Sequence, residues 1–179
     1  MSKILCIYYS RSGKTKAVME EIAQELEAEL VELHDRVDRS GAGGWLRCGL
    51  DAVRRSTPPL EPFYTQKALS SYQLVVLGTP VWAGRCSAVM RGFLKKNGRK
   101  LRKVAYVATR STEEKSEQMF DQMDQYVPGS RVAEVSLRVG SVGYAFWRED
   151  FLRRVREFLE TDVDETEEVI REERDAFRD

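Results

Sequence analysis

The sequence has very few of the residues from which metal sites are built. Its 179 residues include one histidine, His34, and three cysteines. The cysteines, Cys6, Cys48 and Cys86, lack the short spacings of zinc ligands, so we expect no histidine- or cysteine-based metal centre. Their odd number is typical of reduced thiols, which predicts a cytoplasmic location.

An excess of charge of one sign is also absent. Lysine and arginine together number 29, as do aspartate and glutamate, so the formal net charge is zero. Such a chain has no electrostatic attraction for nucleic acid, and we expect it to bind none. Long hydrophobic runs are missing as well. The apolar run Ile4–Tyr9 is too short for the core of a signal peptide or for a transmembrane segment, and neither is expected.

The sequence does contain a regular alternation of strand and helix patterns. Apolar residues make up 42% of the chain, enough for the core of one domain. Short apolar runs predict strands at 3–9, 31–34, 74–77, 104–108 and 132–139. The helical spacing of apolar residues predicts helices at 14–30, 41–54, 86–97, 113–126 and 147–160. The alternation predicts an α/β fold, a doubly wound five-stranded parallel sheet with helices on both faces.

The predicted domain covers residues 1–160, and residues 161–179 form a charged C-terminal helical tail. Glutamates and arginines at helical spacings in the tail are typical of a solvated helix or a frayed end. A sharper interpretation is that the tail packs against a second copy of the chain, which would make the protein a homodimer. The apolar side chains for such an interface are Val163, Val169, Ile170 and Phe177.

The segment Ser10–Thr15, with the sequence SRSGKT, directly follows the first predicted strand and opens the first predicted helix. Backbone N–H groups and hydroxyls at a helix N-terminus bind phosphate. A nucleotide-triphosphate loop would need a glycine at the position of Tyr8, so a kinase or ATPase loop is disfavoured. Taken alone, the segment fits a ligand-free turn in which Ser12 caps the helix as well as it fits a phosphate site.

Two further loops follow the third and fourth predicted strands. They are residues 79–85, with the sequence TPVWAGR, and residues 109–112, with the sequence TRST. Ligands of an open parallel sheet bind beyond the carboxyl ends of its strands, where the winding reverses. All three loops are rich in hydroxyls, glycine or an aromatic residue. We therefore expect them to meet in one ligand site.

Two of these loops resemble motifs of the flavodoxin-like FMN-binding family. The segment Ser10–Thr15 matches the family's phosphate loop, [ST]-x-[ST]-G-x-[ST], and residues 78–84 are similar to the loop that lies against the isoalloxazine ring. The resemblance extends from residue 3 to about residue 160. It implies FMN as the cofactor, the strand order 2-1-3-4-5, and Trp82 as the stacking partner of the flavin. The candidate cofactor-binding residues are Ser10, Arg11, Ser12, Gly13, Lys14, Thr15, Thr79, Pro80, Val81, Trp82, Ala83, Gly84, Thr109, Arg110 and Ser111.

The third loop, residues 109–112, departs from the family because it has neither glycine nor an aromatic residue. One hypothesis is that the charge of Arg110 lies near the N1/O2 edge of the flavin. There it would stabilise the anionic reduced form and so raise the reduction potential of the flavin. The alternative is that Arg110 points to solvent. In the first loop, the side chains of Arg11 and Lys14 are expected to be mainly solvated.

Three functions remain open for such a chain. An electron carrier would serve a redox partner protein, although such carriers resemble one another in being strongly acidic and this chain is neutral. A small flavin-dependent reductase would pass electrons from NAD(P)H or a quinol to a small-molecule acceptor such as a quinone, at a site flanked by residues 43–45, Arg47, Arg54 and Arg55. A flavodoxin-fold interaction or sensor module would bind FMN weakly or not at all. No catalytic residue is assigned.

Overall fold

The computed structural model describes residues 2–176, with side chains described as far as Asp162. Its strands are β1 (Ile4–Tyr8), β2 (Glu29–Glu32), β3 (Leu74–Trp82), β4 (Arg85–Cys86), β5 (Val104–Thr109) and β6 (Arg131–Leu137). Its helices are α1 (Lys14–Glu25), α2 (Gly41–Val53), α3 (Ala88–Asn97), α4 (Gln118–Asp124) and α5 (Tyr144–Ala176). Strands and helices alternate along most of the chain, as the sequence predicts.

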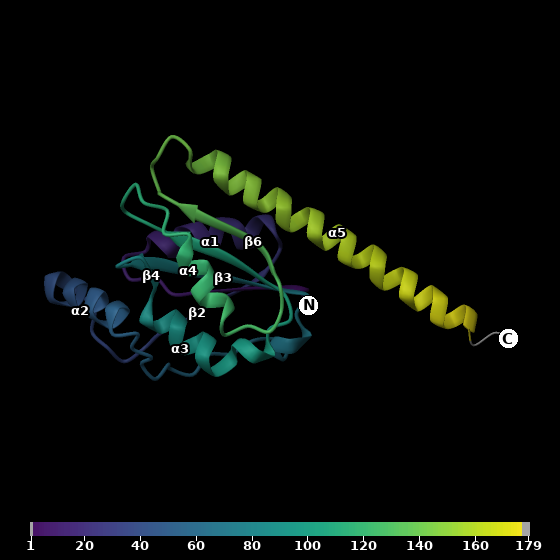
Figure 1. Ribbon diagram of the computed structural model, residues 1–179, viewed down its shortest axis with the longest axis horizontal. Helices are drawn as coiled ribbons and strands as arrows, with labels where there is room; N and C mark the ends of the chain where they lie inside the picture. The colour runs from purple at the N-terminus through teal and green to yellow at the C-terminus, as the bar shows by residue number, and fades with distance from the viewer. Residues whose placement is uncertain (1, 177–179) are drawn as a thin grey trace.

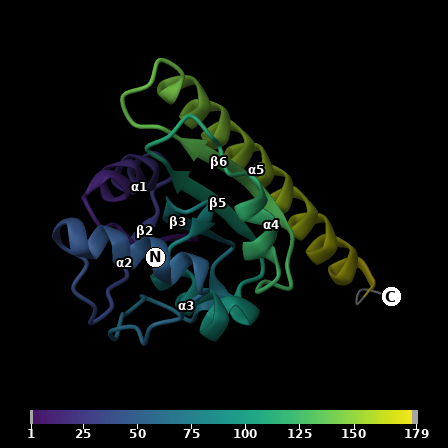
Figure 2. The ribbon, with the colours of Figure 1, turned by 60° about the vertical axis from the view of Figure 1, so that its left-hand side comes forward.

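The long strands form one parallel sheet in the order β2-β1-β3-β5-β6. This order confirms the predicted doubly wound sheet. The direction of winding reverses between β1 and β3. Figures 1 and 2 show α1 and α5 on one side of the sheet and α3 and α4 on the other. The two-residue strand β4, which the sequence analysis did not predict, pairs antiparallel with the end of β3.

The alternation of side chains along β1 divides the core into two layers. Leu5 and Ile7 belong to a cluster with Phe93 of α3 and Phe120 of α4. The intervening β1 residues belong to a second cluster, which contains Ile22 of α1 and the α5 side chains. These α5 side chains are Phe151, Leu152 and Val155. Because both faces of the sheet are buried, its strands appear in the sequence as continuous apolar runs.

The second strand lies two residues earlier than expected, at Glu29–Glu32 in place of 31–34. Its register pairs Leu5 with Glu29 and Tyr8 with Glu32, so the end of β1 also fixes the end of β2. The preceding helix α1 stops at Glu25 and not at residue 30, because Glu27 takes a left-handed backbone conformation with φ 49°. Helices commonly end in this way at glycine. A glutamate there gives no signal in the sequence.

Three other bounds differ from expectation. Strand β3 continues through the predicted loop as far as Trp82, because Thr79 and Pro80 still pair with β5. Helix α4 is shorter than the expected 113–126. The last helix begins at Tyr144 and runs to Ala176 without a break at residue 160. The expected subunit contacts at Val163, Val169, Ile170 and Phe177 lie outside the residues whose side chains are described.

Among the described residues, no helix is both long and apolar enough to cross a membrane. The same part of the chain contains no cluster of three or more histidine, cysteine or carboxylate side chains that could hold a metal ion.

Candidate functional site

The first loop leaves the N-terminus of α1 without a side-chain cap. The residue before the helix is Gly13, with φ 86°, and no side chain accepts a hydrogen bond from the first turn. Ser10 Oγ instead accepts from the Gly13 N–H at 3.1 Å, inside the loop. The interpretation of Ser12 as the helix cap is therefore wrong. In α3, by contrast, Ser87 Oγ accepts from the Met90 N–H at 3.1 Å. The N–H groups that open α1 remain available to an anion.

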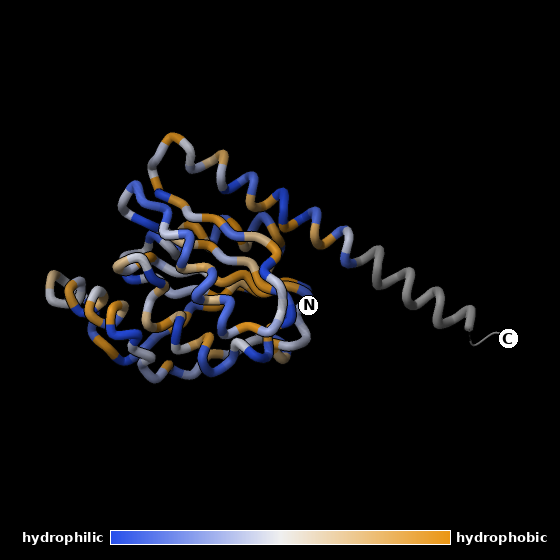
Figure 3. The backbone as a smooth tube through the Cα atoms, viewed as in Figure 1, coloured by the Kyte–Doolittle hydropathy of each residue, from blue (hydrophilic) through white to orange (hydrophobic). Residues whose placement is uncertain are grey.

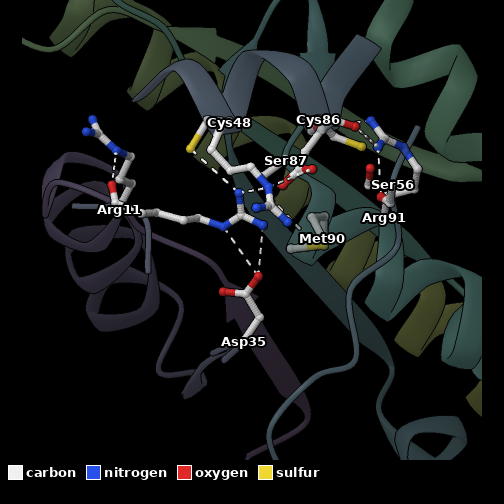
Figure 4. Close-up of polar contacts among 11 residues, drawn as sticks. Arg11, Asp35, Cys48, Ser56, Cys86, Ser87, Met90 and Arg91 are labelled. Carbon is white, nitrogen blue, oxygen red and sulfur yellow. Dashed lines mark hydrogen bonds and ion pairs between the residues drawn. The ribbon is translucent and has the colours of Figure 1, made fainter. Parts of the chain in front are cut away.

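Arg11 ties the first loop to the start of α2. Its Nε donates to the Arg39 carbonyl at 2.8 Å and its Nη2 donates to the Gly41 carbonyl at 2.9 Å. Figure 4 shows the side chain reaching from the loop toward this backbone. The Arg11 guanidinium is therefore bound to the protein backbone, although we expected it to be mainly solvated. Lys14, in contrast, is exposed.

Two buried threonines join the first and third loops. Thr15 Oγ1 and Thr109 Oγ1 lie 2.8 Å apart and share a hydrogen bond, although 94 residues separate them in sequence. Both side chains are buried. This bond fixes the start of α1 against the carboxyl end of β5, which explains why both threonines belong to the same site.

The second loop is a tight hairpin between β3 and β4. Trp82 pairs with Arg85, and the two residues between them, Ala83 and Gly84, have φ 47° and 70°. Two consecutive residues with positive φ make the turn that best matches the twist of a hairpin. Thr79 is fully buried behind this loop, where its Oγ1 accepts from the Ser87 N–H at 3.0 Å. It supports the hairpin from inside.

Trp82 is held between an aromatic edge and a buried cation. The ring of Tyr9 meets the indole edge-on, with centroids 5.6 Å apart and an interplanar angle of 86°. The Arg39 guanidinium lies 5.2 Å from the Trp82 ring centroid. These two contacts fix the orientation of the indole.

The cation behind Trp82 has two carboxylate partners. Arg39 pairs with Asp35 at 2.9 Å and with Asp51 at 2.8 Å, and the guanidinium is almost fully buried (Figure 4). Burial opposes ionisation of Asp51, but the hydrogen bond and charge of Arg39 outweigh it and hold the pKa of that carboxyl below its usual value. Burial raises the pKa of the neighbouring Cys48 thiol. This thiol therefore stays protonated near neutral pH.

At the carboxyl edge of the sheet the three loops line one cavity, and the second and third loops together with α2 line a second cavity beside it. The smaller, of about 120 Å³, is lined by residues 11–12 and 14–15, residues 80–82, residues 109–111, Trp45 and Val139. The larger, of about 510 Å³, extends past the hairpin. Residues common to both cavities are Trp45, Val81, Trp82, Arg110 and Ser111. The structure therefore confirms the prediction that the three loops meet at this edge of the sheet.

Most of the predicted site residues line one of these two cavities. Ser10, Gly13 and Thr79 do not, and they shape the loops from behind. Trp45 and Val139 line the smaller cavity but were absent from the predicted set. Trp45 was expected only at the flank of a substrate site. The loop after β6 carries no polar motif, so nothing in the sequence distinguished Val139.

Arg110 has a buried nitrogen that faces no protein acceptor. Its Nη1 donates to the carbonyls of Thr112 and Glu113, which turns the guanidinium back over its own loop. Its Nε is buried and has no hydrogen-bond partner among the described residues. Arg110 lines both cavities, so its guanidinium brings a positive charge to them.

Comparison with known proteins agrees with this geometry. A family model described as flavodoxin matches residues 3–146. The chain belongs to the flavodoxin family. A comparison of this flavodoxin-family chain with curated proteins finds no significant match.

Solved structures similar to this flavodoxin-family chain include a flavoprotein from Lactobacillus acidophilus NCFM in complex with FMN. It is 24% identical, with a TM-score of 0.64, over 82% of this chain and 99% of that one. A protein from Bacteroides uniformis ATCC 8492, assigned as a flavoprotein, is 18% identical with a TM-score of 0.62, over 87% and 98% of the two chains. A WrbA-like flavodoxin from Agrobacterium tumefaciens is 14% identical with a TM-score of 0.55, over 88% and 99%. At these identities the likenesses show the fold.

Proposed function

We propose that this chain binds FMN in the two adjoining cavities and uses it to pass electrons to a small acceptor such as a quinone. The observation that carries the proposal is the convergence of three loops on cavities that open beside an uncapped helix N-terminus. Membership of the flavodoxin family and the FMN-bound Lactobacillus acidophilus structure support the choice of cofactor.

The smaller cavity suits a phosphate monoester. The N–H groups that open α1 and the exposed hydroxyl of Ser12 would donate hydrogen bonds to the phosphate oxygens. Lys14 adds a positive charge at the same mouth. Thr15, bound to Thr109, would hold the loop in place from below.

The larger cavity suits a flat, partly apolar ring. Trp82, with its orientation fixed by Tyr9 and Arg39, would provide a stacking face, and Trp45 would cover the ring from α2. The positive charge of Arg110, which lines both cavities, would lie near the N1/O2 edge of the flavin. FMN, when bound, supplies the electron and hydride chemistry, while these residues bind it and set its surroundings.

The choice between carrier and reductase rests on charge. A zero net charge gives no long-range steering toward a basic redox partner protein, so we favour a reductase that takes electrons from NAD(P)H or a quinol. A cytoplasmic location and the absence of nucleic-acid partners remain predictions, as does the assignment of residues 1–160 to the FMN-binding domain.

The experiment is a titration of the purified, flavin-free protein with FMN and with riboflavin, followed by flavin fluorescence. Ser12→Asp places a negative charge against the phosphate and should weaken FMN binding by more than about tenfold while leaving riboflavin binding unchanged. Ser71→Asp, an exposed serine in the turn that precedes β3, is the matched control. A wild-type protein that takes up no FMN would reject the proposal and favour an interaction or sensor module.

A second measurement separates the two redox functions. Addition of NADPH to the FMN-loaded protein under anaerobic conditions should bleach the flavin absorption band if the protein is a reductase. An unchanged band, followed by bleaching on addition of a reductase protein, would identify an electron carrier.

A further inference from the structure

The large hydrophobic side chains that lie in solvent are gathered in two segments. Apart from Tyr64, those found exposed in the described part of the chain belong to residues 45–53 or residues 139–147. Figure 3 shows hydrophobic colour on the outer α2 helix and on the turn before α5, at the same end of the molecule. Soluble chains normally scatter such side chains, so a concentration at one end indicates a contact surface.

The first segment is the outer face of α2. Trp45, Leu46, Leu50 and Val53 are between 42% and 69% exposed. We call these four residues the α2 patch. The opposite side of the helix is held to the body by the Arg39–Asp51 pair and by Gly44, which lies against the backbone of Arg39. The apolar side therefore faces outward because the polar side is the anchored one.

The exposed charged residues of α2 and of the turn that ends it are all arginines. Within residues 41–55 the exposed charged side chains are Arg47, Arg54 and Arg55, whereas the only carboxylate, Asp51, is buried. Arg47 pairs with Asp51 at 3.3 Å, and no ion pair to Arg54 or Arg55 is found among the described residues. The exposed charge of α2 and of the turn that ends it is thus positive, although the protein as a whole is neutral.

Arg55 occupies a backbone position that favours glycine. Its φ is 54°, and the N–H groups of Arg55 and Ser56 donate to the carbonyls of Ala52 and Asp51, which is the usual helix ending with a left-handed residue. An arginine costs about 1 kcal/mol there relative to glycine. Among the described residues, no hydrogen bond or ion pair of the Arg55 side chain is found, so its charge is open to solvent.

The second segment connects β6 to α5. Residues 139–147 contain no charged residue, and Val139, Val142 and Phe146 are exposed. We call these three residues the α5 patch. Arg138 and Arg148 flank the segment, and carboxylates pair with both of them: Glu113 with Arg138, and Glu21 and Glu149 with Arg148. The free positive charge is therefore that of α2. Because Val139 and Trp45 both line the smaller cavity, the two patches border the same cavity.

We propose that the α2 patch and the α5 patch form a docking surface for an anionic lipid bilayer. Apolar side chains that include tryptophan, with arginines beside them and no exposed carboxylate on the helix, are the composition of helices that lie in a membrane interface. In the docked orientation the mouth of the cavities faces the lipid. Since no described helix can span a membrane, the association is peripheral.

A bilayer fits this surface better than a second copy or an acidic protein. Two copies that met through α2 would bring Arg54 and Arg55 of each chain toward the arginines of the other helix, whose only carboxylate, Asp51, is buried. An acidic protein would complement this charge but not the two separate apolar patches, which both border the smaller cavity. A fluid interface accommodates both patches at once, because lipids rearrange around protruding side chains.

The test is flotation of the full-length protein with vesicles of phosphatidylcholine alone or mixed with phosphatidylglycerol, at low and high salt. We expect binding only to the mixed vesicles, and less binding at high salt. The double variant R54Q/R55Q should lower the partition coefficient by about 30-fold. Its matched control is K95Q/K96Q, which removes two adjacent exposed charges from α3.

The apolar contribution is tested in the same way. Leu46→Ser should lower partitioning by at least about tenfold, whereas Tyr64→Ser, at an even more exposed apolar residue outside both patches, should not change it. Failure of the wild-type protein to float, or equal binding by R54Q/R55Q, would overturn the proposal. So would a wild-type dimer in light scattering that does not float and that Leu46→Ser converts to monomer, since the surface would then join two copies.

Flotation is read by protein and FMN uptake by fluorescence, so the two proposals fail separately. A protein that floats but binds no FMN would reject only the proposed redox function. A protein that binds FMN but never floats would reject only the docking surface.

Discussion

Arg39 is the residue on which the geometry behind the candidate flavin site depends. It lies against Trp82, and its two carboxylate partners come from the segment before α2 and from α2 itself. Arg11 binds the carbonyl of the same residue. Arg39 thus connects these parts, through its guanidinium to the stacking face and α2 and through its backbone carbonyl to the phosphate loop. Loss of a partner leaves a buried charge only partly compensated, which is costly.

Asp51→Asn should therefore lower the free energy of unfolding at neutral pH by about 1 to 3 kcal/mol. The pKa of Asp51 is lowered in the fold, so its stabilisation is present above the pKa of an unfolded aspartate, about 3.9, and is lost as the pH falls through the lower folded value. Urea unfolding at pH 7 and at pH 3 measures both effects. The difference between wild type and variant should shrink at the lower pH, and Glu160→Gln, at an exposed carboxylate, should show no difference at either.

Arg110 makes a prediction about the cofactor. Its positive charge beside both cavities would favour the anionic reduced flavin, so Arg110→Ala should lower the two-electron potential. A charge acting through a partly aqueous medium is worth about 1 kcal/mol, which is about 20 mV for a two-electron couple. Spectroelectrochemical titration of the FMN-loaded protein measures it, with Lys95→Ala as the control. An unchanged potential would mean that Arg110 serves only its own loop.

At the scale of elements, α2 is attached in an unusual way. Its buried residues are Gly44, Cys48, Asp51 and Ala52, and none of them belongs to the two hydrophobic core clusters. Arg91 of α3 adds to the attachment, donating to the carbonyls of Asp51, Ser56 and Cys86 (Figure 4). Polar contacts and close backbone packing therefore hold α2 against the domain, whereas hydrophobic packing holds the other helices.

Two neighbouring glycines test the close packing. A Cβ on Gly44 would lie 2.0 Å from the carbonyl carbon of Arg39, whereas one on Gly43 would meet nothing within 4 Å. Gly44→Ala should destabilise the protein by about 1 to 3 kcal/mol or more. Gly43→Ala should be neutral or stabilise it by up to about 1 kcal/mol, because alanine favours helix. Urea unfolding of the two variants compares them directly, and equal stabilities would contradict the packing described.

At the scale of the whole molecule, α5 connects the domain to the C-terminal extension. The family model ends at residue 146, yet Phe151, Leu152 and Val155 of α5 are buried in the core. The last described contact joins Gln73 Nε2 to Asp162 Oδ2 at 2.7 Å. Figure 1 shows the helix continuing past the sheet. The domain therefore needs the first part of α5, whatever the rest contributes.

A chain that ends after Asp162 should keep the melting temperature of the full-length protein within a few degrees. A chain that ends at residue 146 should not fold, because it loses three buried side chains that together contribute several kcal/mol. Thermal unfolding followed by circular dichroism checks both. Light scattering of the two folded lengths tests the predicted homodimer, and a dimer that persists without the extension would place its interface elsewhere.

The sequence by itself determined the fold and the meeting of the three loops. Continuous apolar runs alternate with helical periodicity, and this pattern is typical of a parallel sheet whose loops gather at one edge. It did not determine where α1 ends or where β2 lies, because Glu27 adopts a conformation that the sequence usually marks with glycine, and because β1 sets the register.

Only the tertiary structure decided what the individual side chains do. From the sequence, Ser12 is expected to cap a helix, Arg11 to be solvated, and Trp45 to flank a substrate site. Each of these predictions uses only the neighbours that are close in sequence. In the fold, Gly13 precedes the helix, Arg11 binds backbone 28 and 30 residues away, and Trp45 lines both cavities. Contacts between residues distant in sequence fix these roles, and no local pattern records them.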